Sequence, residues 1–318
     1  MSDTLHTAPH FWGEKRYYSL DYYLKKTFGE KVYRLSLNGG MSCPNRDGLL
    51  DSRGCIFCSA GGSGDFAAAP AKSVTEQIAE AKMRILAKSS CQKFIAYFQA
   101  YTNTYASVSY LREIFTEAIY HPDIVALSIA TRFDCLSDEV LNLLAELNRI
   151  KPVWIELGVQ SMYPATHAFI RSGLDLMQLE PVVTKLRDRD IAVIVHLILG
   201  LPGETKEMML TSLARVTELP IQGIKLQLLH VLKGTDLATF YEKEPFPLFT
   251  MNEYCNFIVD CLERIPETIV VHRITGDGPR QLLLAPLWST DKKRVLNTIQ
   301  RILKERDTWQ GKDRIIYG

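Results

Sequence analysis

The 318-residue sequence has no hydrophobic run long enough to cross a membrane and no apolar segment at its start. Its longest apolar stretch, Ile191–Leu199, is interrupted by His196 and is about half of the ~20 residues that a membrane helix requires. Met1–His10 contains neither an apolar core nor a small-residue cleavage motif, so no secretory signal is predicted. These absences predict a cytoplasmic protein with no membrane partner.

The sequence also lacks an excess of one charge. It contains 37 Lys and Arg against 36 Asp and Glu, a formal net charge of +1. This balance argues against strong general attraction to nucleic acid, although it is compatible with a local basic patch. With 47% hydrophobic and 23% charged residues, the composition is that of an ordinary folded chain and excludes a disordered or fibrous one.

A secreted disulfide framework is not predicted either, because the seven cysteines are odd in number and the chain is long. Three cysteines form a group in which Cys43 is followed, after eleven residues, by Cys55-Ile56-Phe57-Cys58. Three thiolates can hold three irons of a [4Fe–4S] cluster and leave the fourth iron open. A structural zinc site is the alternative, and it needs a fourth ligand such as Cys91. The remaining four are interpreted as core thiols: Cys91, Cys135, Cys255 and Cys261.

Short apolar runs alternate with helical stretches along the chain. The predicted strands are Val32–Leu37, Phe94–Gln99, Ile124–Ala130, Val153–Gly158, Ile191–Leu199 and Gly223–Leu229, with Ile269–His272 as a weaker candidate. The alternation predicts βαβ units and an α/β fold, a partial (β/α)6-type TIM barrel with its site at the C-terminal strand ends. We place the barrel at residues 31–265, an N-terminal extension at 1–30, and a C-terminal extension at 266–318 as a possible substrate or RNA contact.

Polar residues on the predicted strands share one face of the sheet. Because side chains alternate along a strand, Glu156, Gly158 and Gln160 lie on one face, and the apolar residues between them lie on the other. A buried carboxylate or amide is unfavourable without a partner. This face therefore predicts a site inside the barrel, with a satisfied structural hydrogen-bond layer as the alternative.

Other candidates come from the third strand and from the loop after the second. Ser128 and Arg132 share a face with Ala130, which leaves space for a ligand at the strand end. Thr102 and Asn103 lie in a loop rich in hydrogen-bonding groups. Such a loop is suited to an amino-acid-like headgroup, and an ordinary polar turn is the alternative.

Two further polar residues lie on apolar strands. His196, considered alone, is more typical of a satisfied core histidine than of a ligand. Lys225 is suited to contact an anionic group or to pair with Glu156.

Ordered segments of the chain resemble the radical S-adenosylmethionine (radical SAM) superfamily. The wide spacing from Cys43 to Cys55-x-x-Cys58 is similar to that of small bacterial proteins related to the elongator catalytic subunit and to oxygen-independent coproporphyrinogen oxidases. It departs from the usual C-x-x-x-C-x-x-C. Ser128–Asp134 resembles the elongator-type I-x-T-R-P-D segment, with Phe133 in place of its Pro.

Two further segments resemble those of the family, and one family segment is missing. Ile155–Ser161 resembles the family segment E-[IL]-G-V-Q-S, and His196–Gly203 resembles its H-then-L-P segment. The Gly-Gly-Glu segment that follows the second strand in the family has no counterpart here. Tyr101–Tyr105 occupies its place, so the contacts to the SAM amino group are not carried over.

The resemblance implies one [4Fe–4S] cluster, with S-adenosylmethionine chelating its open iron and reduced flavodoxin or ferredoxin as electron donor. It implies that Gln160, Arg171 and His196 hold the SAM ribose and carboxylate. The predicted site comprises the catalytic candidate Glu156, the metal ligands Cys43, Cys55 and Cys58, and the cofactor-binding candidates Thr102, Asn103, Ser128, Arg132, Gln160, Arg171 and His196.

The resemblance also suggests a tRNA substrate, because the elongator relative acts at C5 of the wobble uridine. The expected reaction converts a carboxymethylaminomethyl side chain to aminomethyl. Eight basic and three acidic residues lie between Lys292 and Arg314, and six basic and three acidic between Glu14 and Arg34, where tyrosines are interleaved. Phosphate contact and base stacking use these residue types. The alternatives are a radical SAM oxidase of a porphyrinogen-like molecule and a non-enzymatic zinc-stabilised RNA-binding module.

Overall fold

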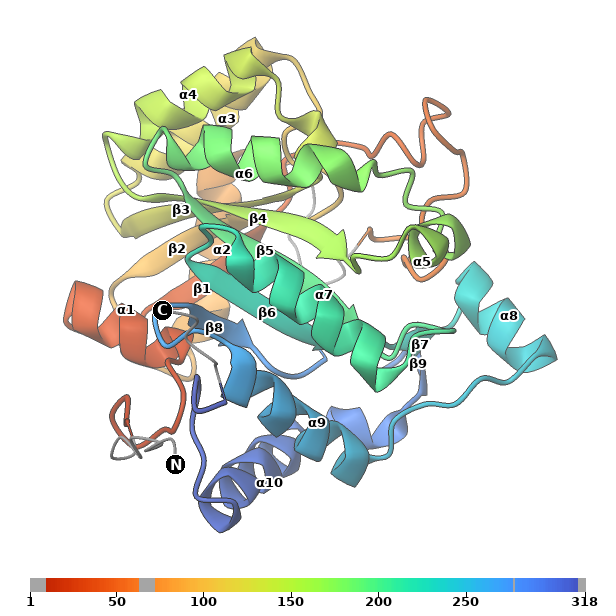
Figure 1. The fold of residues 1–318 in the computed structure, drawn as a ribbon. Coiled ribbons are helices and arrows are strands. Elements are labelled where there is room, and N and C mark those ends of the chain that lie inside the picture. Colours follow the sequence, from red (N-terminus) through yellow and green to blue (C-terminus); the bar gives the residue numbers. More distant parts are fainter. Residues whose placement is uncertain (1–9, 63–71, 277, 314–318) are drawn as a thin grey trace.

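A computed structural model describes residues 10–62, 72–276 and 278–313. Its centre is a parallel sheet of seven strands in the order β1-β2-β3-β4-β5-β6-β8, which curls into a half-barrel (Figure 1). The strands are β1 (Tyr33–Leu37), β2 (Phe94–Phe98), β3 (Ile124–Thr131), β4 (Val153–Gln160), β5 (Ala192–Leu199), β6 (Gly223–Leu228) and β8 (Val270–Arg273). This architecture confirms the predicted α/β fold of the partial TIM-barrel kind.

Helices between the strands cover the outer face of the sheet (Figure 1). They are α2 (Val74–Leu86), α3 (Val108–Tyr120), α4 (Asp138–Asn148), α6 (Leu179–Arg187), α7 (Lys206–Glu218) and α9 (Met251–Arg264). Side chains at their starts satisfy free backbone amides: Ser73 and Thr250 each form a capping box with a Glu three residues later. The helices between the strands are therefore stabilised by their own capping residues as well as by packing against the sheet.

The remaining elements lie at the ends of the half-barrel or, in the case of α10, against the outer helix α9. The helices are α1 (Leu20–Phe28), α5 (Pro164–Phe169), α8 (Asp236–Lys243) and α10 (Lys292–Glu305), and the short 3-10 turns are η1 (Phe133–Cys135), η2 (Leu176–Gln178) and η3 (Leu287–Thr290). β7 (Val231–Leu232) and β9 (Leu283–Ala285) form a separate antiparallel ribbon. Helix α10 packs against α9 at the bottom of Figure 1.

The two faces of the sheet have different chemistry, as the alternation predicts. On β4, Ile155, Leu157 and Val159 are fully buried in the core beneath the outer helices. On the inner face, Trp154 packs with α1 residue Leu24 and with apolar residues of β2, β3 and β5. Helix α1 thus closes the N-terminal end of the half-barrel, and the site lies at the opposite end.

The sheet continues past residue 265 because β8 pairs with β6. The two chain ends also meet, since Gln310 accepts a 2.8 Å hydrogen bond from the Tyr18 backbone amide. The division at residues 30 and 265 stays a prediction. Arg314, part of the predicted basic segment, lies outside the described residues.

Candidate active site

One chamber opens at the C-terminal ends of the strands. The loop after β1 supplies Cys43, Cys55 and Cys58 to one wall. The floor and the other walls include Tyr97, Gln99, Thr102, Arg132, Glu156, Gln160, His196, Lys225, Gln227, His230 and Arg273. The three predicted cluster cysteines and most of the predicted polar residues therefore share one space.

The cysteine loop is shaped mainly by backbone hydrogen bonds. The Arg46 amide donates to the Cys43 carbonyl at 2.7 Å, and the Gly54 amide donates to the Asn45 carbonyl at 2.7 Å. Gly54 has a φ of +80°, a conformation that glycine adopts readily. The Arg46 guanidinium donates to the Ser59 carbonyl at 2.6 Å, so the loop is held across its width.

Helix α8 docks on the same loop from the C-terminal half of the chain. The Leu237 amide donates to the Ile56 carbonyl at 2.9 Å, and the Ile56 amide donates to the Ile170 carbonyl at 3.2 Å. Ile56 and Phe57 pack against an apolar cluster that contains Ile170 and Leu237. The position of the thiols therefore depends on segments far apart in the sequence.

The cysteines are free thiols, and each is partly exposed. A hydrogen bond from Cys58 lowers the pKa of Cys55 to about 7, with burial opposing and Asn45 assisting. The same contact, together with burial, raises the pKa of Cys58 well above its usual range. One thiol of the C-x-x-C pair is thus poised to become a thiolate, which is the form that ligates metal.

These donors fit an iron–sulfur cluster. Within the described ranges, no three His, Cys, Asp or Glu side chains converge on a single metal-ion position. A [4Fe–4S] cluster takes its thiolates at separate irons, so three thiols spread along one wall satisfy its donor requirement.

Glu156 is the centre of the chamber floor and is fully buried. Its Oε1 accepts from Ser128 Oγ at 2.8 Å and lies 2.8 Å from the Arg34 guanidinium. Its Oε2 accepts from His196 Nε2 at 2.9 Å and from Lys225 Nζ. Burial opposes ionisation, but the surrounding cations and donors hold the pKa of Glu156 well below its usual range.

His196 is neutral in this setting. Burial, and then the Lys225 charge, lowers the pKa of His196 to about 4. Because ionised Glu156 only accepts hydrogen bonds, the His196 proton is assigned to Nε2. Nδ1 then remains an acceptor on a side chain that lines the chamber.

Among the predicted cofactor residues, Thr102, Arg132 and Gln160 line the chamber. Gln160 has a left-handed backbone, φ +68°, at a register shift between β4 and β5. Its side-chain amide folds over Gly158, where an added Cβ would come within 2.8 Å of Nε2. Arg132 forms a two-point ion pair with Asp134.

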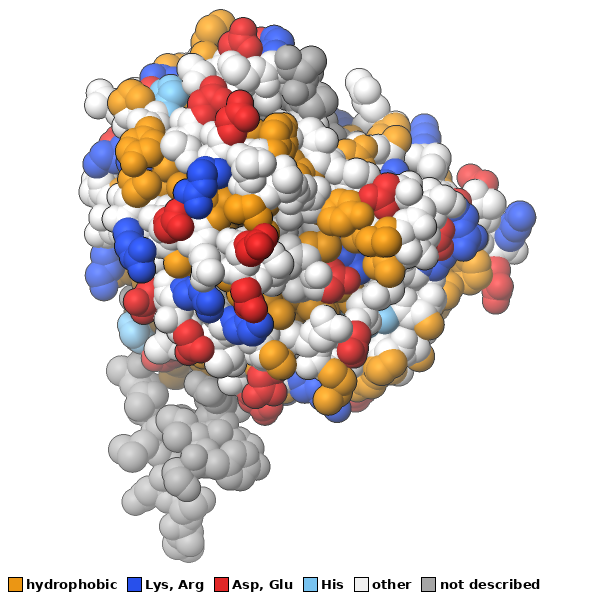
Figure 2. Space-filling view, turned by 90° about the horizontal axis from the view of Figure 1, so that it is seen from above, with side chains coloured by type: hydrophobic (Ala, Val, Ile, Leu, Met, Phe, Trp, Pro, Cys, Tyr) orange, Lys and Arg blue, Asp and Glu red, His pale blue; other side chains and the backbone are white. Residues whose placement is uncertain are grey.

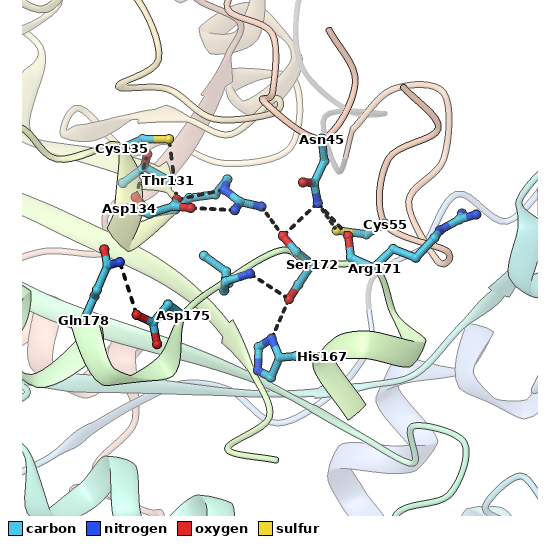
Figure 3. A network of polar contacts seen from close by, with 12 residues as sticks. Asn45, Cys55, Thr131, Asp134, Cys135, His167, Arg171, Ser172, Asp175 and Gln178 are labelled. Atoms are coloured by element: carbon cyan, nitrogen blue, oxygen red, sulfur yellow. Dashed lines mark hydrogen bonds and ion pairs between the residues drawn. The ribbon is translucent and has the colours of Figure 1, made fainter. Parts of the chain in front are cut away.

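Three predicted residues are directed elsewhere. Ser128 donates to Glu156 beneath the chamber, and Asn103 Nδ2 donates to the Ala130 carbonyl at 2.8 Å. The Arg171 guanidinium pairs with Asp236 of α8 at 2.6 Å, and Figure 3 shows it pointing away from Cys55. The chamber lining, as far as the structure describes it, includes none of these three residues.

The sequence interpretation missed several residues of the floor and loop. Arg34 on β1 reaches Glu156, and its guanidinium lies 4.9 Å from the centre of the Tyr97 ring. Both lie on the inner face of the sheet, as Glu156 does, so strand alternation could have identified them. Asn45, which contacts Cys55, has no such signal because its contacts depend on the fold of a loop.

Comparison with known proteins identifies the class. The Radical SAM superfamily profile matches residues 52–216, and the Radical_SAM C-terminal domain profile matches residues 221–305. The chain belongs to the radical SAM superfamily, whose fold implies SAM and a [4Fe–4S] cluster.

Two relatives in sequence and one in structure illustrate the match. Protein YtqA of Bacillus subtilis strain 168 is 45% identical over 299 residues, which are 94% of this chain and 93% of that protein. A tRNA uridine(34) acetyltransferase of Methanocaldococcus infernus is 26% identical over 163 residues, 50% of this chain and 30% of that protein. The fold is similar to that of the archaeal Methanocaldococcus infernus Elp3 with an N-terminal deletion, with a TM-score of 0.67 at 17% identity, covering 88% of this chain and 64% of that one.

The outer surface adds two observations. In the described parts of the chain, no helix is both long and apolar enough to span a membrane. Figure 2 shows acidic and basic side chains interspersed on the face that carries the upper helices of Figure 1. Among the described side chains visible on that face, neither charge gathers into one patch.

Proposed function

We propose that this chain cleaves SAM at a [4Fe–4S] cluster ligated by Cys43, Cys55 and Cys58. The substrate that we propose is the wobble uridine of tRNA, at whose C5 side chain carboxymethylaminomethyl is converted to aminomethyl. The observation that carries the proposal is that three free thiols of one loop line the same chamber as the polar ends of the parallel strands. In this fold such strand ends are the usual place for catalysis.

The bound cluster and SAM would supply a 5′-deoxyadenosyl radical that abstracts hydrogen from the carboxymethyl carbon next to the amine nitrogen. Return of the remaining electron to the cluster would leave an imine, and water would release the two-carbon group as glyoxylate and leave the aminomethyl group. The chain's own residues would position the reactants. Thr102, Arg132 and Gln160 would contact the SAM headgroup and ribose, and neutral His196 would offer Nδ1 to a ribose hydroxyl. Glu156 would hold the floor rigid through its four contacts; its direct part in catalysis stays a prediction.

Two features support a tRNA substrate. The first is the partial similarity to tRNA uridine(34) acetyltransferases. The second is the start of α10, where three cationic residues and one carboxylate line one shallow groove: Lys293, Arg294, Arg301 and Asp291, with Asn297 and Thr298. Cationic and amide side chains of this kind suit phosphate contacts.

The tyrosine-rich N-terminal stretch is less suited to RNA contact. Tyr17 is buried, and Tyr23 packs on Trp154 at the closed end of the half-barrel, with ring centres 6.0 Å apart. We therefore place RNA contact on α10 and on the rim of the chamber. Reduced flavodoxin or ferredoxin is the electron donor that we propose.

Anaerobic reconstitution with iron and sulfide tests the cluster proposal. We expect about four irons per wild-type chain and loss of the cluster's visible absorption in Cys43→Ala, Cys55→Ala and Cys58→Ala. Cys255→Ala is the matched control, because that thiol is fully buried between α9 and α10. One equivalent of zinc without labile sulfide would contradict the proposal.

The substrate is tested separately by mass spectrometry of tRNA nucleosides from a strain that lacks the gene. We expect the carboxymethylaminomethyl wobble uridine to accumulate and the aminomethyl form to fall. Return of the wild-type gene should reverse the change, and return of the Cys55→Ala gene should not. An unchanged wobble-uridine profile would refute the tRNA substrate while leaving the cluster proposal intact.

A further inference from the structure

Asn45 lies between two of the proposed cluster ligands and is almost fully buried, with 1% of its surface exposed. Its Nδ2 lies 2.8 Å from the Arg171 carbonyl, 2.9 Å from the Ser172 carbonyl and 3.3 Å from Cys55 Sγ (Figure 3). Because Nδ2 carries two hydrogens for these three acceptors, one N–H is shared between Cys55 Sγ and a carbonyl. The side chain therefore connects the cysteine loop to the segment after α5 and also contacts a sulfur.

The orientation of the Asn45 amide follows from its surroundings. Two backbone carbonyls face one end of the amide, and carbonyls only accept hydrogen bonds. The NH2 group must therefore occupy that end, which leaves Oδ1 without a partner among the described residues. A flipped amide would place three acceptors together, so the N–H group that faces Cys55 is assigned by the contacts themselves.

The carbonyl of Ser172 is itself held in place by other residues. It also accepts from the Arg132 guanidinium at 2.6 Å, and Ser172 Oγ contacts His167 Nδ1 at 2.5 Å. His167 Nε2 lies 2.8 Å from the Ser161 carbonyl at the end of β4. This network ties the Asn45 amide to the end of β4 and orients its NH2 group toward the sulfur. Figure 3 shows the part of it around Asn45, Ser172 and His167.

We propose that Asn45 is a positioning residue that donates an N–H···S hydrogen bond to Cys55 and thereby raises the reduction potential of the cluster. The inference rests on the proposed cluster ligation by Cys55. Hydrogen bonds to ligand sulfurs are among the factors that set iron–sulfur potentials. A donor at Sγ stabilises the reduced cluster, because reduction adds negative charge that the sulfur shares.

The test is an anaerobic redox titration of reconstituted protein, followed by electron paramagnetic resonance of the reduced cluster. Asn45→Ala and Asn45→Ser remove or shorten the donor. We expect a more negative midpoint potential in both, with the larger shift in Asn45→Ala, at iron and sulfide contents close to wild type.

Gln77→Ala is the matched control. Gln77 is equally buried and also donates from one amide nitrogen to two backbone carbonyls, those of Asn38 at 2.9 Å and Lys72 at 3.0 Å. Among the described residues, its hydrogen bonds involve no sulfur. A general loosening of the fold would affect Gln77→Ala and Asn45→Ala alike. We expect the midpoint potential of Gln77→Ala to equal that of the wild type.

The outcomes separate this inference from the proposed function. A midpoint potential in Asn45→Ala equal to that of the wild type would overturn it. Failure of both Asn45 variants to hold a cluster that Gln77→Ala retains would also overturn it, because Asn45 would then be only a structural clamp. Absence of a cluster in the wild type, or its persistence in Cys55→Ala, would instead refute the proposed ligation.

Discussion

Glu156→Gln changes the charge balance of the chamber floor without changing the shape of the side chain. Glu156 is the only carboxylate among the described residues that line the chamber, and it lies between Arg34 and Lys225. With His196 neutral, these three residues carry one negative and two positive charges. The variant would leave two positive charges in a buried space with no counter-charge.

Removing one partner of a buried ion pair destabilises proteins by about 3–5 kcal/mol. Burial already lowers the pKa of Lys225 well below its usual range, and Glu156 is the main influence that opposes this. In the variant, Lys225 would lose its proton more readily. Its deprotonation removes one of the two positive charges, so the loss of stability is smaller at high pH. We therefore expect Glu156→Gln to lower the free energy of unfolding by about 3 kcal/mol at pH 8 and by more at pH 6. The melting temperature should fall by about 6–20 °C.

The double variant Glu156→Gln/Lys225→Met provides the control. It removes one positive charge together with the negative one, so the excess charge returns to the wild-type value. We expect it to be more stable than Glu156→Gln alone, with a coupling of about 1–3 kcal/mol in the double-mutant cycle. The cycle also includes the single variant Lys225→Met. Tyr97, whose hydroxyl accepts from Lys225 Nζ at 3.3 Å, is unchanged in all three variants.

The assay is urea and thermal unfolding of the cofactor-free protein under reducing conditions, followed by circular dichroism. Equal slopes of free energy against urea would show that the variants unfold from comparable states. A Glu156→Gln loss below about 1 kcal/mol at pH 6, or strictly additive effects in the cycle, would refute the view that Glu156 neutralises the floor.

Two further predictions concern pH and the cysteine loop. Because folding lowers the pKa of His196 to about 4, the unfolded state binds a proton that the folded state does not; stability should fall between about pH 6.5 and 4, by up to about 3 kcal/mol. The measurement is the urea unfolding midpoint at pH 7 and at pH 5. The two midpoints should differ less in His196→Gln than in the wild type. Equal wild-type midpoints at the two pH values would contradict the prediction. Gly62→Ala would place a Cβ 2.2 Å from the Tyr101 ring at φ +55°, whereas Gly48→Ala, at φ +93°, meets nothing within 4 Å. Both variants should lose about 1 kcal/mol of stability, because alanine is strained in a left-handed backbone. Only Gly62→Ala should lose a further ~1–3 kcal/mol from overpacking against Tyr101. Equal melting temperatures of the two variants would show that Tyr101 moves aside.

The inner face of the sheet was predictable because strand alternation is a local property. Glu156 and Gly158 share the face that the two-residue period assigns to them. The pairing of Lys225 with Glu156 was one of two predictions for Lys225. The seventh strand was a weak candidate because β8 is short. β7 and β9, of two and three residues, are too short to carry a periodic signal.

Residues whose direction depends on an unusual backbone could not be placed from sequence. Arg171 has a φ of +54°, and the resulting turn sends its guanidinium to Asp236 and leaves its carbonyl toward Asn45. A motif match assigns a residue type and a position, but the left-handed turn decides which atom faces the chamber. The same holds for Gln160, whose side chain folds back over the end of its own strand.

The two halves of the chamber are therefore stabilised by different physics. The floor is built on adjacent parallel strands, where buried charges compensate one another, so its residues are coupled and single substitutions there should affect folding. The cysteine wall is a loop held by backbone carbonyls, by Asn45 and by the docking of α8, so substitutions there should change the cluster site before they unfold the chain. A variant such as Asn45→Ala should therefore report mainly on the proposed metal site, whereas a variant at Glu156 reports on the whole fold. The order of experiments follows: the folding of each variant must be measured before a loss of activity at the floor is attributed to chemistry.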